Sequence, residues 1–504
     1  MEKHYLVVLL LISVFFTSFS SAQSTEPLVR GRTLQKDSLL LDLHMLEKAL
    51  TEAHPGIYRY NQVEDIRHQF ERLRRQVYDG MTEAVFMKQL AKTVVQIKCG
   101  HTYLNPWNMP YATRKRLFGG NIYLPIGFEV VDGRFYLTHK AFDEEDFKTG
   151  AEILSINGHS TQAIYDSLKT ITKRDGNNTS PASQYLSMNN FGVRPWQFFD
   201  LYFPLFFPLT APKYELTYRN YDSDQIHEIS IDALSKKQRA EAMEKKYGSN
   251  VNGKKRWSLD LSHPNLAIME LNDFAIWNWK GFDQAKWFQQ AFDTIQQLGI
   301  TNLVVDIRSN SGGLTEPKNE LISYLTPQKI DCSRAAKTLI RTTQVDSIFK
   351  PYVETWVPHI YTGLPAETYE VYKDGFYLLK GDGGCQDILP KEKGFKGKTY
   401  FFGGATNVSA TFDLLNKAQK FEFGTFIGET TGGNQQGING GQYLFLTLPY
   451  SQIEVDIPLI YYQPSTPRPD AGVQPDVTVK RTQADIAQQR DPHLEYVLKE
   501  IGER

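Results

Sequence analysis

Cysteine is scarce in this sequence of 504 residues, and neither sign of charge is in excess. The three cysteines, Cys99, Cys332 and Cys385, are too far apart in the sequence for a disulfide framework or a CxxC metal clamp. They allow at most one bridge, for which Cys332 and Cys385 are the favoured pair. Lysine and arginine number 56 against 57 aspartates and glutamates, so no net field attracts the chain to nucleic acid or to anionic lipid. We expect neither as a partner.

Long hydrophobic runs and metal-binding patterns are also missing. A membrane-spanning helix needs about 20 mostly apolar residues, whereas the oily stretch 195–208 is shorter, carries Asp200 and is interrupted by Pro204. We therefore expect no stable membrane insertion. The 11 histidines include no HExxH motif and no other ligand spacing. The fragment 397–399 (GKT) is not a P-loop, because the earlier glycine is replaced by Glu392. The sequence predicts neither a metal nor another cofactor.

The first 22 residues are typical of a secretory signal peptide. Lys3 precedes the apolar run 5–16, and small residues ending at Ala22 follow it as a cleavage site. The run is too short to span a bilayer. We expect the mature chain to begin at Gln23 and the protein to be exported, to a periplasm or to the extracellular space.

Residues 23–118 are predicted to form an N-terminal helical domain, one of roughly three domains that the length allows. Its leucines recur at helical spacing until His54-Pro55-Gly56 ends the pattern. Thr82 is placed to cap a later helix, and Gly100 is that helix's expected C-cap. His101 is therefore expected just beyond a helix C-terminus.

Residues 119–232 change to a period of two, which predicts a small β-rich domain with turns at 132–133 and 157–158. The order of elements and the segment 150–158 (GAEILSING) resemble a PDZ domain, which binds an extended peptide as an added strand. That resemblance assigns peptide binding to Ile126, Gly127 and Phe128. A β domain that only packs is the alternative. Residues 173–212 look like an insertion, aromatic in its second half, that either covers a groove or lines one.

Residues 233–504 alternate strands with helices, which predicts an α/β core with a mixed sheet, flanking helices and a C-terminal helix. Two strand-to-helix junctions in this core are candidate sites. Segment 306–313 (DIRSNSGG) ends a buried strand with paired glycines, which leave backbone amides free. The second junction places Ser409 at a helix N-terminus, where the helix field and the Ala410 amide would stabilise an oxyanion. A serine at such a position is more often only an N-cap.

The motifs in combination resemble the tail-specific, or C-terminal processing, serine peptidase family, which includes the tricorn protease core and the interphotoreceptor retinoid-binding protein modules. The resemblance covers most of the mature chain and implies a ClpP/crotonase-like core. It is carried by the segments 54–56 (HPG), 306–313 (DIRSNSGG), 406–410 (TNVSA), 427–433 (IGETTGG) and 472–476 (GVQPD), in that order.

The resemblance also implies a catalytic design. One branch of the family pairs its serine with a lysine in a GxxTxGKG segment, but Asn434 occupies that position here, and an amide cannot accept the serine proton. The tricorn-like branch takes a histidine from the N-terminal part, and segment 100–102 (GHT) is similar to that element. The resemblance thus makes Ser409 the nucleophile and His101 the general base, with Asp470 as an orienting acid.

Further roles follow from the same comparison. The oxyanion hole is expected to consist of the Ala410 amide with that of Gly312 or Gly313. Cys99 lies two residues from His101, and we interpret it as a buried structural thiol, because such close neighbours seldom face each other as nucleophile and base. Arg308 and Asp306 either bind substrate or form a salt bridge that supports the junction.

The sequence therefore predicts an exported serine endopeptidase that hydrolyses unfolded proteins or peptides by a Ser-His mechanism, with capture of C-terminal tails by the PDZ-like unit. The alternative is a non-catalytic binding protein for a hydrophobic ligand or peptide on the same scaffold. Aromatic residues, which make up 13% of the chain and cluster at 198–207, keep that alternative open. No oligomeric state is indicated.

Overall fold

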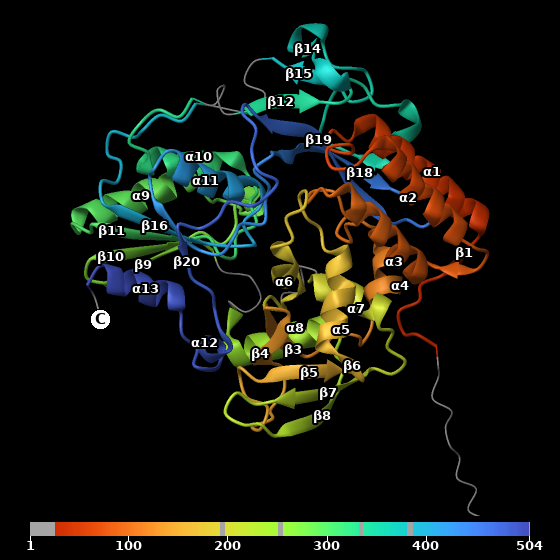
Figure 1. Cartoon of the computed structure of the whole chain (residues 1–504), viewed down its shortest axis with the longest axis horizontal. Coiled ribbons are helices and arrows are strands. Elements are labelled where there is room, and N and C mark those ends of the chain that lie inside the picture. The colour runs from red at the N-terminus through yellow and green to blue at the C-terminus, as the bar shows by residue number, and fades with distance from the viewer. Residues whose placement is uncertain (1–25, 192–196, 250–255, 332–335, 381–386, 503–504) are drawn as a thin grey trace, which may run out of the picture.

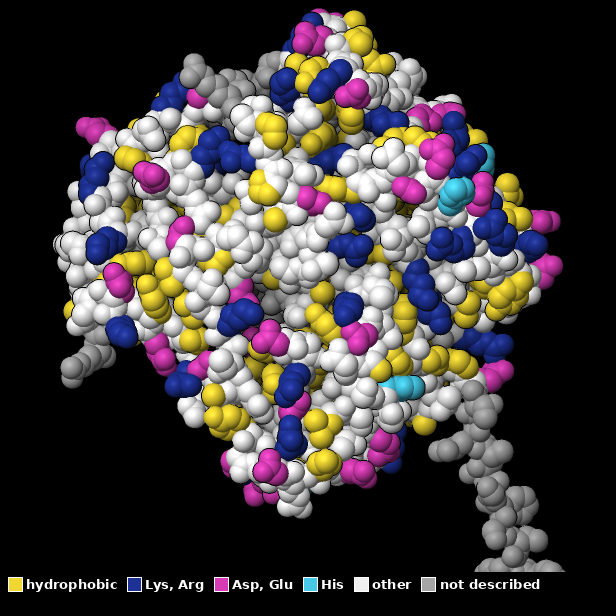
Figure 2. All heavy atoms as spheres, viewed as in Figure 1, with side chains coloured by type: hydrophobic (Ala, Val, Ile, Leu, Met, Phe, Trp, Pro, Cys, Tyr) yellow, Lys and Arg dark blue, Asp and Glu magenta, His cyan; other side chains and the backbone are white. Residues whose placement is uncertain are grey.

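The computed structural model describes residues 26–191, 197–249, 256–331, 336–380 and 387–502 (Figure 1). The predicted signal peptide, Cys332 and Cys385 lie outside these ranges. The fold is mixed α/β with several sheets and flanking helices, as predicted. Within the described ranges, no helix has the length and apolar character needed to cross a bilayer. On the face shown in Figure 2, cationic and anionic side chains are interspersed, which agrees with the balanced composition.

The N-terminal helices pack a leucine face inward. Leu39, Leu43, Leu46 and Leu50 of the first helix are all fully buried, as the spacing predicted. The hydroxyl of Thr82 accepts a hydrogen bond from the Val85 amide at 3.3 Å and caps the third helix, also as predicted. The elements are β1 (Thr33–Leu34), α1 (Lys36–Ala53), α2 (Val63–Gln76), β2 (Met81–Thr82), α3 (Glu83–Val94), η1 (Val95–Ile97) and α4 (Tyr111–Phe118).

The C-terminal end of α3 differs from the prediction. The helix ends at Val94, the short turn η1 follows, and Lys98 rather than Gly100 adopts the left-handed conformation, with φ of 58°. The chain then turns again, because the Thr102 amide donates to the Cys99 carbonyl at 3.1 Å. His101 therefore lies in a loop without a regular helix directly behind it, and the expected contribution of a helix dipole is lost.

The β-rich unit is an antiparallel sheet in the order β3-β4-β5-β7-β8, with β6 paired to β5. Both predicted turns occur. Asp132 and Gly133 have φ values of 48° and 80°, and Asn157 and Gly158 have 51° and 76°, which suits tight hairpin turns. The elements are β3 (Ile126–Val131), β4 (Arg134–Lys140), β5 (Glu152–Ile156), β6 (His159–Ser160), α5 (Thr161–Leu168), η2 (Lys169–Ile171), β7 (Lys213–Arg219), β8 (Ile226–Asp232) and α8 (Lys236–Tyr247).

The insertion between η2 and β7 covers this sheet. It contains α6 (Pro181–Leu186) and α7 (Phe198–Phe206). Phe199 of α7 packs edge-on against Phe128 of β3, with ring centroids 5.0 Å apart. Asp200, the one charge of the oily stretch, forms a buried ion pair with Arg239 of α8. Of the two roles predicted for the insertion, the structure favours covering a groove.

The core contains a six-stranded sheet in the order β20-β17-β16-β11-β10-β9. Every neighbouring pair is parallel except β9 with β10. Helices α9, α10 and α11 pack on one face, and α13 packs on the other. The elements are β9 (Ser258–His263), β10 (Leu266–Glu270), η4 (Ile276–Asn278), α9 (Gln284–Gln297), β11 (Asn302–Asp306), α10 (Thr315–Leu325), β16 (Lys398–Gly403), α11 (Ser409–Lys420), β17 (Thr425–Gly428), β20 (Val477–Thr478), α12 (Gln483–Ala487) and α13 (Pro492–Glu500).

A second sheet, in the order β13-β18-β19-β12-β15-β14, connects the core to the N-terminal helices. Leu446 of β18 and Val455 of β19 share one hydrophobic cluster with Leu43 of α1. The same arrangement is visible in Figure 1, where β18 and β19 lie between α1 and the core. Its elements are β12 (Ala336–Ile340), η5 (Ser347–Phe349), β13 (Val353–Glu354), η6 (Ala366–Thr368), β14 (Tyr369–Val371), η7 (Lys373–Gly375), β15 (Tyr377–Leu379), β18 (Ile438–Thr447) and β19 (Glu454–Pro464).

Candidate active site

Ser409 is the first residue of α11 and has a backbone φ of 51°. This left-handed conformation is costly for a residue with a side chain, typically by about 1–3 kcal/mol, and such strain gathers at functional sites. Asn407 holds the turn in place. Its side-chain amide donates to the carbonyls of Ile307 and Asn310 at 2.7 and 3.0 Å, and its oxygen accepts from the Gly404 amide at 2.7 Å. The two predicted junctions are thereby joined.

The paired glycines lie directly against the serine. A Cβ on Gly312 would be 2.9 Å from the Cβ of Ser409, so no larger residue fits there without displacing it. The Gly312 amide donates to the side-chain oxygen of Asn310 at 2.9 Å. Within the described part of the chain, the amides of Gly313 and Ala410 have no acceptor. They are therefore the two donors that an oxyanion next to Ser409 can use.

His101 is largely enclosed by the protein. Its Nδ1 atom is buried and has no hydrogen-bond partner among the described residues. Burial lowers the pKa of the imidazole, an effect that the carboxylate of Asp175 partly opposes and the ammonium group of Lys173 reinforces. A neutral imidazole is the form that can accept a proton. His101 is thus held in the protonation state that a general base requires.

The loop of His101 is braced by His54, from the HPG motif. The Nδ1 atom of His54 accepts a hydrogen bond from the Gly56 amide at 2.9 Å, so Nε2 carries the hydrogen of the neutral ring. That nitrogen lies 2.8 Å from the Thr102 hydroxyl, next to His101. Burial lowers the pKa of His54 to about 3, which keeps the ring neutral. The motif therefore supports the position of the candidate base.

Asp175 is the acid that faces the His101 loop. Its Oδ1 atom accepts from the Gly100 amide at 2.8 Å, and a Cβ on Gly100 would lie 2.8 Å from its Oδ2 atom. This close approach explains why glycine precedes the histidine. The Oδ2 atom is buried and, within the described part of the chain, has no hydrogen-bond partner, like Nδ1 of His101. Sequence reasoning missed Asp175, although it lies in the polar half of the insertion.

The prediction that Asp470 orients His101 is not supported by the contacts of this carboxylate. Asp470 accepts hydrogen bonds from the amide and the side chain of Asn177, at 3.0 and 2.6 Å, and from the side chain of Asn434 at 2.6 Å. Within the described ranges, no contact between Asp470 and His101 occurs. These bonds make Asp470 an anchor for the insertion, which carries Asp175.

Asn434 connects the two halves of the site. It lines the same cavity as Ser409, and its side chain donates to the Asp175 carbonyl at 3.0 Å. Gly440 also lines that cavity, and the Nε2 atom of His101 is 4.0 Å from where a Cβ on Gly440 would lie. Among the described residues, Ser409 and His101 are not directly hydrogen-bonded. Both lie near segment 434–440, because Ser409 lines one cavity with Asn434 and Gly440, and the His101 ring approaches Gly440.

Cys99 is buried and carries a free thiol. Burial raises its pKa to about 11, so the thiolate is scarce near neutral pH, and its Sγ atom accepts from the Asn439 side chain at 3.4 Å. These features agree with the structural role predicted for it.

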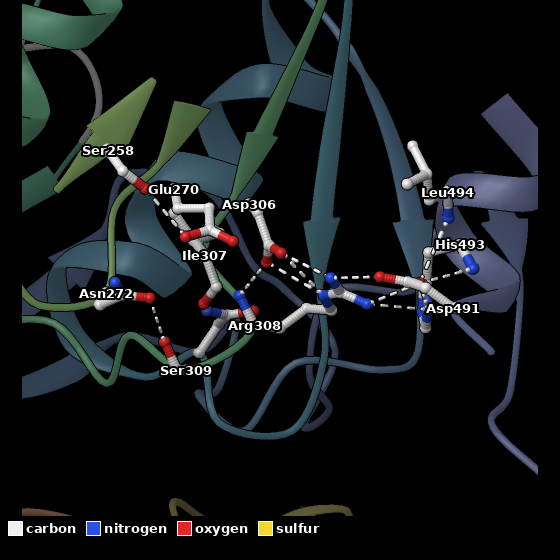
Figure 3. Close-up of polar contacts among 11 residues, drawn as sticks. Ser258, Glu270, Asn272, Asp306, Ile307, Arg308, Ser309, Asp491, His493 and Leu494 are labelled. Atoms are coloured by element: carbon white, nitrogen blue, oxygen red, sulfur yellow. Dashed lines mark hydrogen bonds and ion pairs between the residues drawn. The ribbon is translucent and has the colours of Figure 1, made fainter. Parts of the chain in front are cut away.

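Arg308 forms an ion-pair network (Figure 3). Its guanidinium binds Asp306 at the end of β11 and Asp491 at the start of α13. The pairing with these carboxylates raises the pKa of Arg308, and the pairing with Arg308 lowers that of Asp491. Of the two roles that the sequence left open, the structure favours the salt bridge, which ties the C-terminal helix to the sheet edge that carries the glycine loop.

The predicted peptide-binding strand has no free edge. Ile126 and Phe128 are fully buried, and Phe128 exchanges two backbone hydrogen bonds with Met188, at 3.0 and 2.8 Å. A Cβ on Gly127 would meet the ring of Phe191 at 2.4 Å. The insertion therefore occupies the position of the added strand. The assignment of peptide binding to these three residues does not hold for this conformation.

The sequence model of Peptidase family S41 matches residues 265–479, and a search of the curated proteins finds no match. The solved structure of mature CPAF complexed with lactacystin is similar over 92% of this chain and 97% of that chain, with a TM-score of 0.62 and 13% identity.

Two further solved structures are similar to this chain. Another structure of mature CPAF has a TM-score of 0.59 at 13% identity, over 92% of this chain and 96% of that chain. A photosystem II D1 C-terminal processing protease has a TM-score of 0.40 at 14% identity, over 88% and 93%. The likeness to CPAF shows a shared fold.

The region matched by the family model contains both junctions of the site, with Ser409 and the glycine loop 306–313. His101 and Asp175 lie before it in the sequence and reach the site through the fold. The core of the chain, residues 265–479, therefore matches peptidase family S41, with the motifs in the order expected of tail-specific peptidases, and the protein is a serine peptidase.

Proposed function

We propose that this peptidase is exported and cleaves peptide bonds by acylation of Ser409, with His101 as general base and Asp175 as a positioning group. One observation carries the proposal: Ser409 begins α11 in a strained conformation, and it shares a cavity with Gly313 and Ala410, whose amides have no acceptor among the described residues. An N-cap serine has no need of either feature.

The reaction follows from these positions. The Oγ atom of Ser409 attacks the carbonyl carbon of the substrate while its proton passes to Nε2 of His101. The oxyanion that forms accepts hydrogen bonds from the Gly313 and Ala410 amides. When the intermediate collapses, the carbon–nitrogen bond breaks and His101 returns the proton to the leaving amine. Water then hydrolyses the acyl-enzyme by the same path in reverse.

Transfer of the serine proton requires Nε2 of His101 to come within about 2.6–3.2 Å of Ser409 Oγ. Asn434, the first residue of segment 434–440, is held to Asp175 and Asp470 by hydrogen bonds. A shift of this segment on substrate binding would bring the two groups together. Side-chain contacts of catalytic groups often tighten only in the substrate complex.

Unfolded chains or peptides are the substrates that this site suits, because they can enter extended beside Ser409. Capture of a tail on β3 would need the Met188 segment to leave first. The rival role as a binding protein for hydrophobic ligands loses its main support, because Phe199 and Phe203 of the aromatic cluster are buried in the domain interior.

Two assays test the proposal: labelling by a fluorophosphonate probe and hydrolysis of a denatured protein. The wild type should be labelled on Ser409 and should digest a denatured protein, and Ser409→Ala should lose both activities. Cys99→Ala is the matched control and should keep both. Labelling that survives in Ser409→Ala but disappears in Cys99→Ala would assign the nucleophile to the thiol. Export is tested separately, by N-terminal sequencing of the secreted chain, which should begin at Gln23.

A further inference from the structure

The cavity that Ser409 lines has a strongly cationic wall. Its volume is about 220 Å³, and four basic side chains line it: Lys318, Lys417, Lys420 and Arg468. Among the described residues around this cavity, Asp413 supplies the single carboxylate. The chain as a whole is nearly neutral, so this excess of positive charge is local to the candidate active site.

The two buried lysines share one counter-ion. Lys318 of α10 and Lys417 of α11 both form ion pairs with Asp413, and their side chains are only 7% and 11% exposed. The two lysines lower the pKa of Asp413, so that this carboxylate is ionised. A buried cation without a full counter-charge is costly. Two ammonium groups paired with one carboxylate therefore leave one positive charge without a counter-ion, which a second carboxylate would neutralise.

The geometry of α11 places this positive charge on the same face of the helix as Ser409. Ser409, Asp413 and Lys417 are spaced by four residues and so lie on one face of α11. Each step rises roughly 6 Å along the axis, and helical side chains lean toward the N-terminus. The ammonium of Lys417 accordingly reaches back to Asp413, one turn from Ser409. A carboxylate on a residue next to the scissile bond falls within reach.

We propose that this cavity binds a substrate carboxylate and that the peptidase prefers chains with such a group beside the scissile bond. The carboxylate belongs either to an aspartate or glutamate side chain or to a free C-terminus. Both sources offer the same chemistry to Lys318 and Lys417. The inference rests on the proposed function, because it assigns a specificity to the site of Ser409.

Hydrolysis of matched peptides tests the preference and separates the two sources. One peptide set carries glutamate or glutamine at each position around the cleavage site, and the other ends in a free carboxylate or an amide. We expect the wild type to favour the acidic member of at least one set by about 10- to 100-fold in kcat/KM, the range expected of a buried charged hydrogen bond. Lys417→Met and Lys318→Met should each reduce that ratio toward one.

Lys286→Met, an exposed lysine on the neighbouring helix α9, is the control and should leave the ratio unchanged. Fluorophosphonate labelling counts the correctly folded sites in each variant. Equal cleavage of acidic and neutral peptides by the wild type would overturn the inference, and so would a preference that survives both lysine substitutions.

Binding to Ser409→Ala distinguishes this result from a failure of the proposed function. Fluorescence anisotropy with the glutamate and glutamine peptides measures the pocket without hydrolysis. Tighter binding of the acidic peptide, lost in a Ser409→Ala and Lys417→Met double variant, supports the pocket even if no peptide is cleaved. Equal binding of both peptides contradicts it.

Discussion

Asp175→Asn is predicted to impair catalysis while the fold persists. Asparagine keeps the shape of the side chain, and its oxygen can still accept from the Gly100 amide, whereas the charge that faces His101 is lost. For any two unit charges roughly 5 Å apart at an effective dielectric constant near 20, Coulomb's law gives about 3 kcal/mol, which sets the scale expected for a carboxylate and an imidazolium. We therefore expect kcat/KM to fall by about 10²-fold, since about 1.4 kcal/mol corresponds to a factor of ten.

The pH profile separates this electrostatic role from a structural one. Burial already lowers the pKa of His101, and Asp175 partly restores it. Without the carboxylate, the pKa falls further, so the acid limb of kcat/KM against pH should move to lower pH. Lys173, which also faces His101, remains unchanged in this comparison and lowers the pKa in both proteins.

Asp470→Asn is the matched control. It weakens the anchor to Asn177 and Asn434 and should lower the thermal midpoint without moving the acid limb, because Asp470 does not contact His101. An acid limb and a rate that are unchanged in Asp175→Asn would refute the assignment of Asp175. A shifted limb in Asp470→Asn alone would restore the role that the sequence predicted for that residue.

Three further changes have defined outcomes. Gly312→Ala places a Cβ 2.9 Å from that of Ser409, so fluorophosphonate labelling should slow by roughly 10²-fold, and an unchanged rate would contradict the packing. The folded-state pKa of His54 is about 3, below its unfolded value. Its contribution to stability is therefore present above pH 6.5 and lost as the pH falls toward 3, by up to about 5 kcal/mol. The free energy of unfolding, measured with urea at pH 4 and pH 7, should depend less on pH in His54→Asn than in the wild type. An equal dependence in the two proteins would be evidence against a neutral His54. Finally, burial lowers the pKa of Lys417 to about 8 despite Asp413, so the preference for acidic peptides should weaken above pH 8. Other titratable groups face the same cavity, namely Lys318, Lys420, Arg468 and Tyr462. Repeating the pH profile in Lys417→Met separates their titration from that of Lys417, because the weakening of the preference should vanish in this variant. A weakening that persists there would assign it to another group.

Local patterns in the sequence predicted much of the fold because they are set by neighbouring residues. The leucine face of α1, the cap at Thr82 and the turns at 132–133 and 157–158 depend on residues a few positions apart. The strand-to-helix junction at Ser409 is local in the same sense. Such features are confirmed by the structure.

The polar contacts between distant segments were not predictable in this way. Two hydrogen bonds hold Asp175 at the His101 loop. One comes from the Gly100 amide, 75 positions earlier in the sequence, and the other from the Asn434 side chain, 259 positions later. Nearness to the 472–476 motif in the sequence favours Asp470 as the orienting acid, but the fold gives it Asn177 as a partner. The edge of β3 was expected to be open because a sequence does not show that Met188 pairs with Phe128.

The cationic cavity also depends on packing between helices. Asp413 and Lys417 lie four residues apart on α11, a spacing that by itself indicates an ordinary surface ion pair. Lys318 on α10 turns this pair into a site with excess positive charge beside Ser409. Only the three-dimensional arrangement of the two helices reveals it.

A crystal structure of the enzyme phosphonylated on Ser409 tests the central claim most directly. The account predicts that Nε2 of His101 lies within hydrogen-bond distance of the adduct and that the phosphonyl oxygen accepts from the amides of Gly313 and Ala410. An adduct whose oxygen faces solvent, with Nε2 of His101 outside hydrogen-bond distance of it, would contradict it.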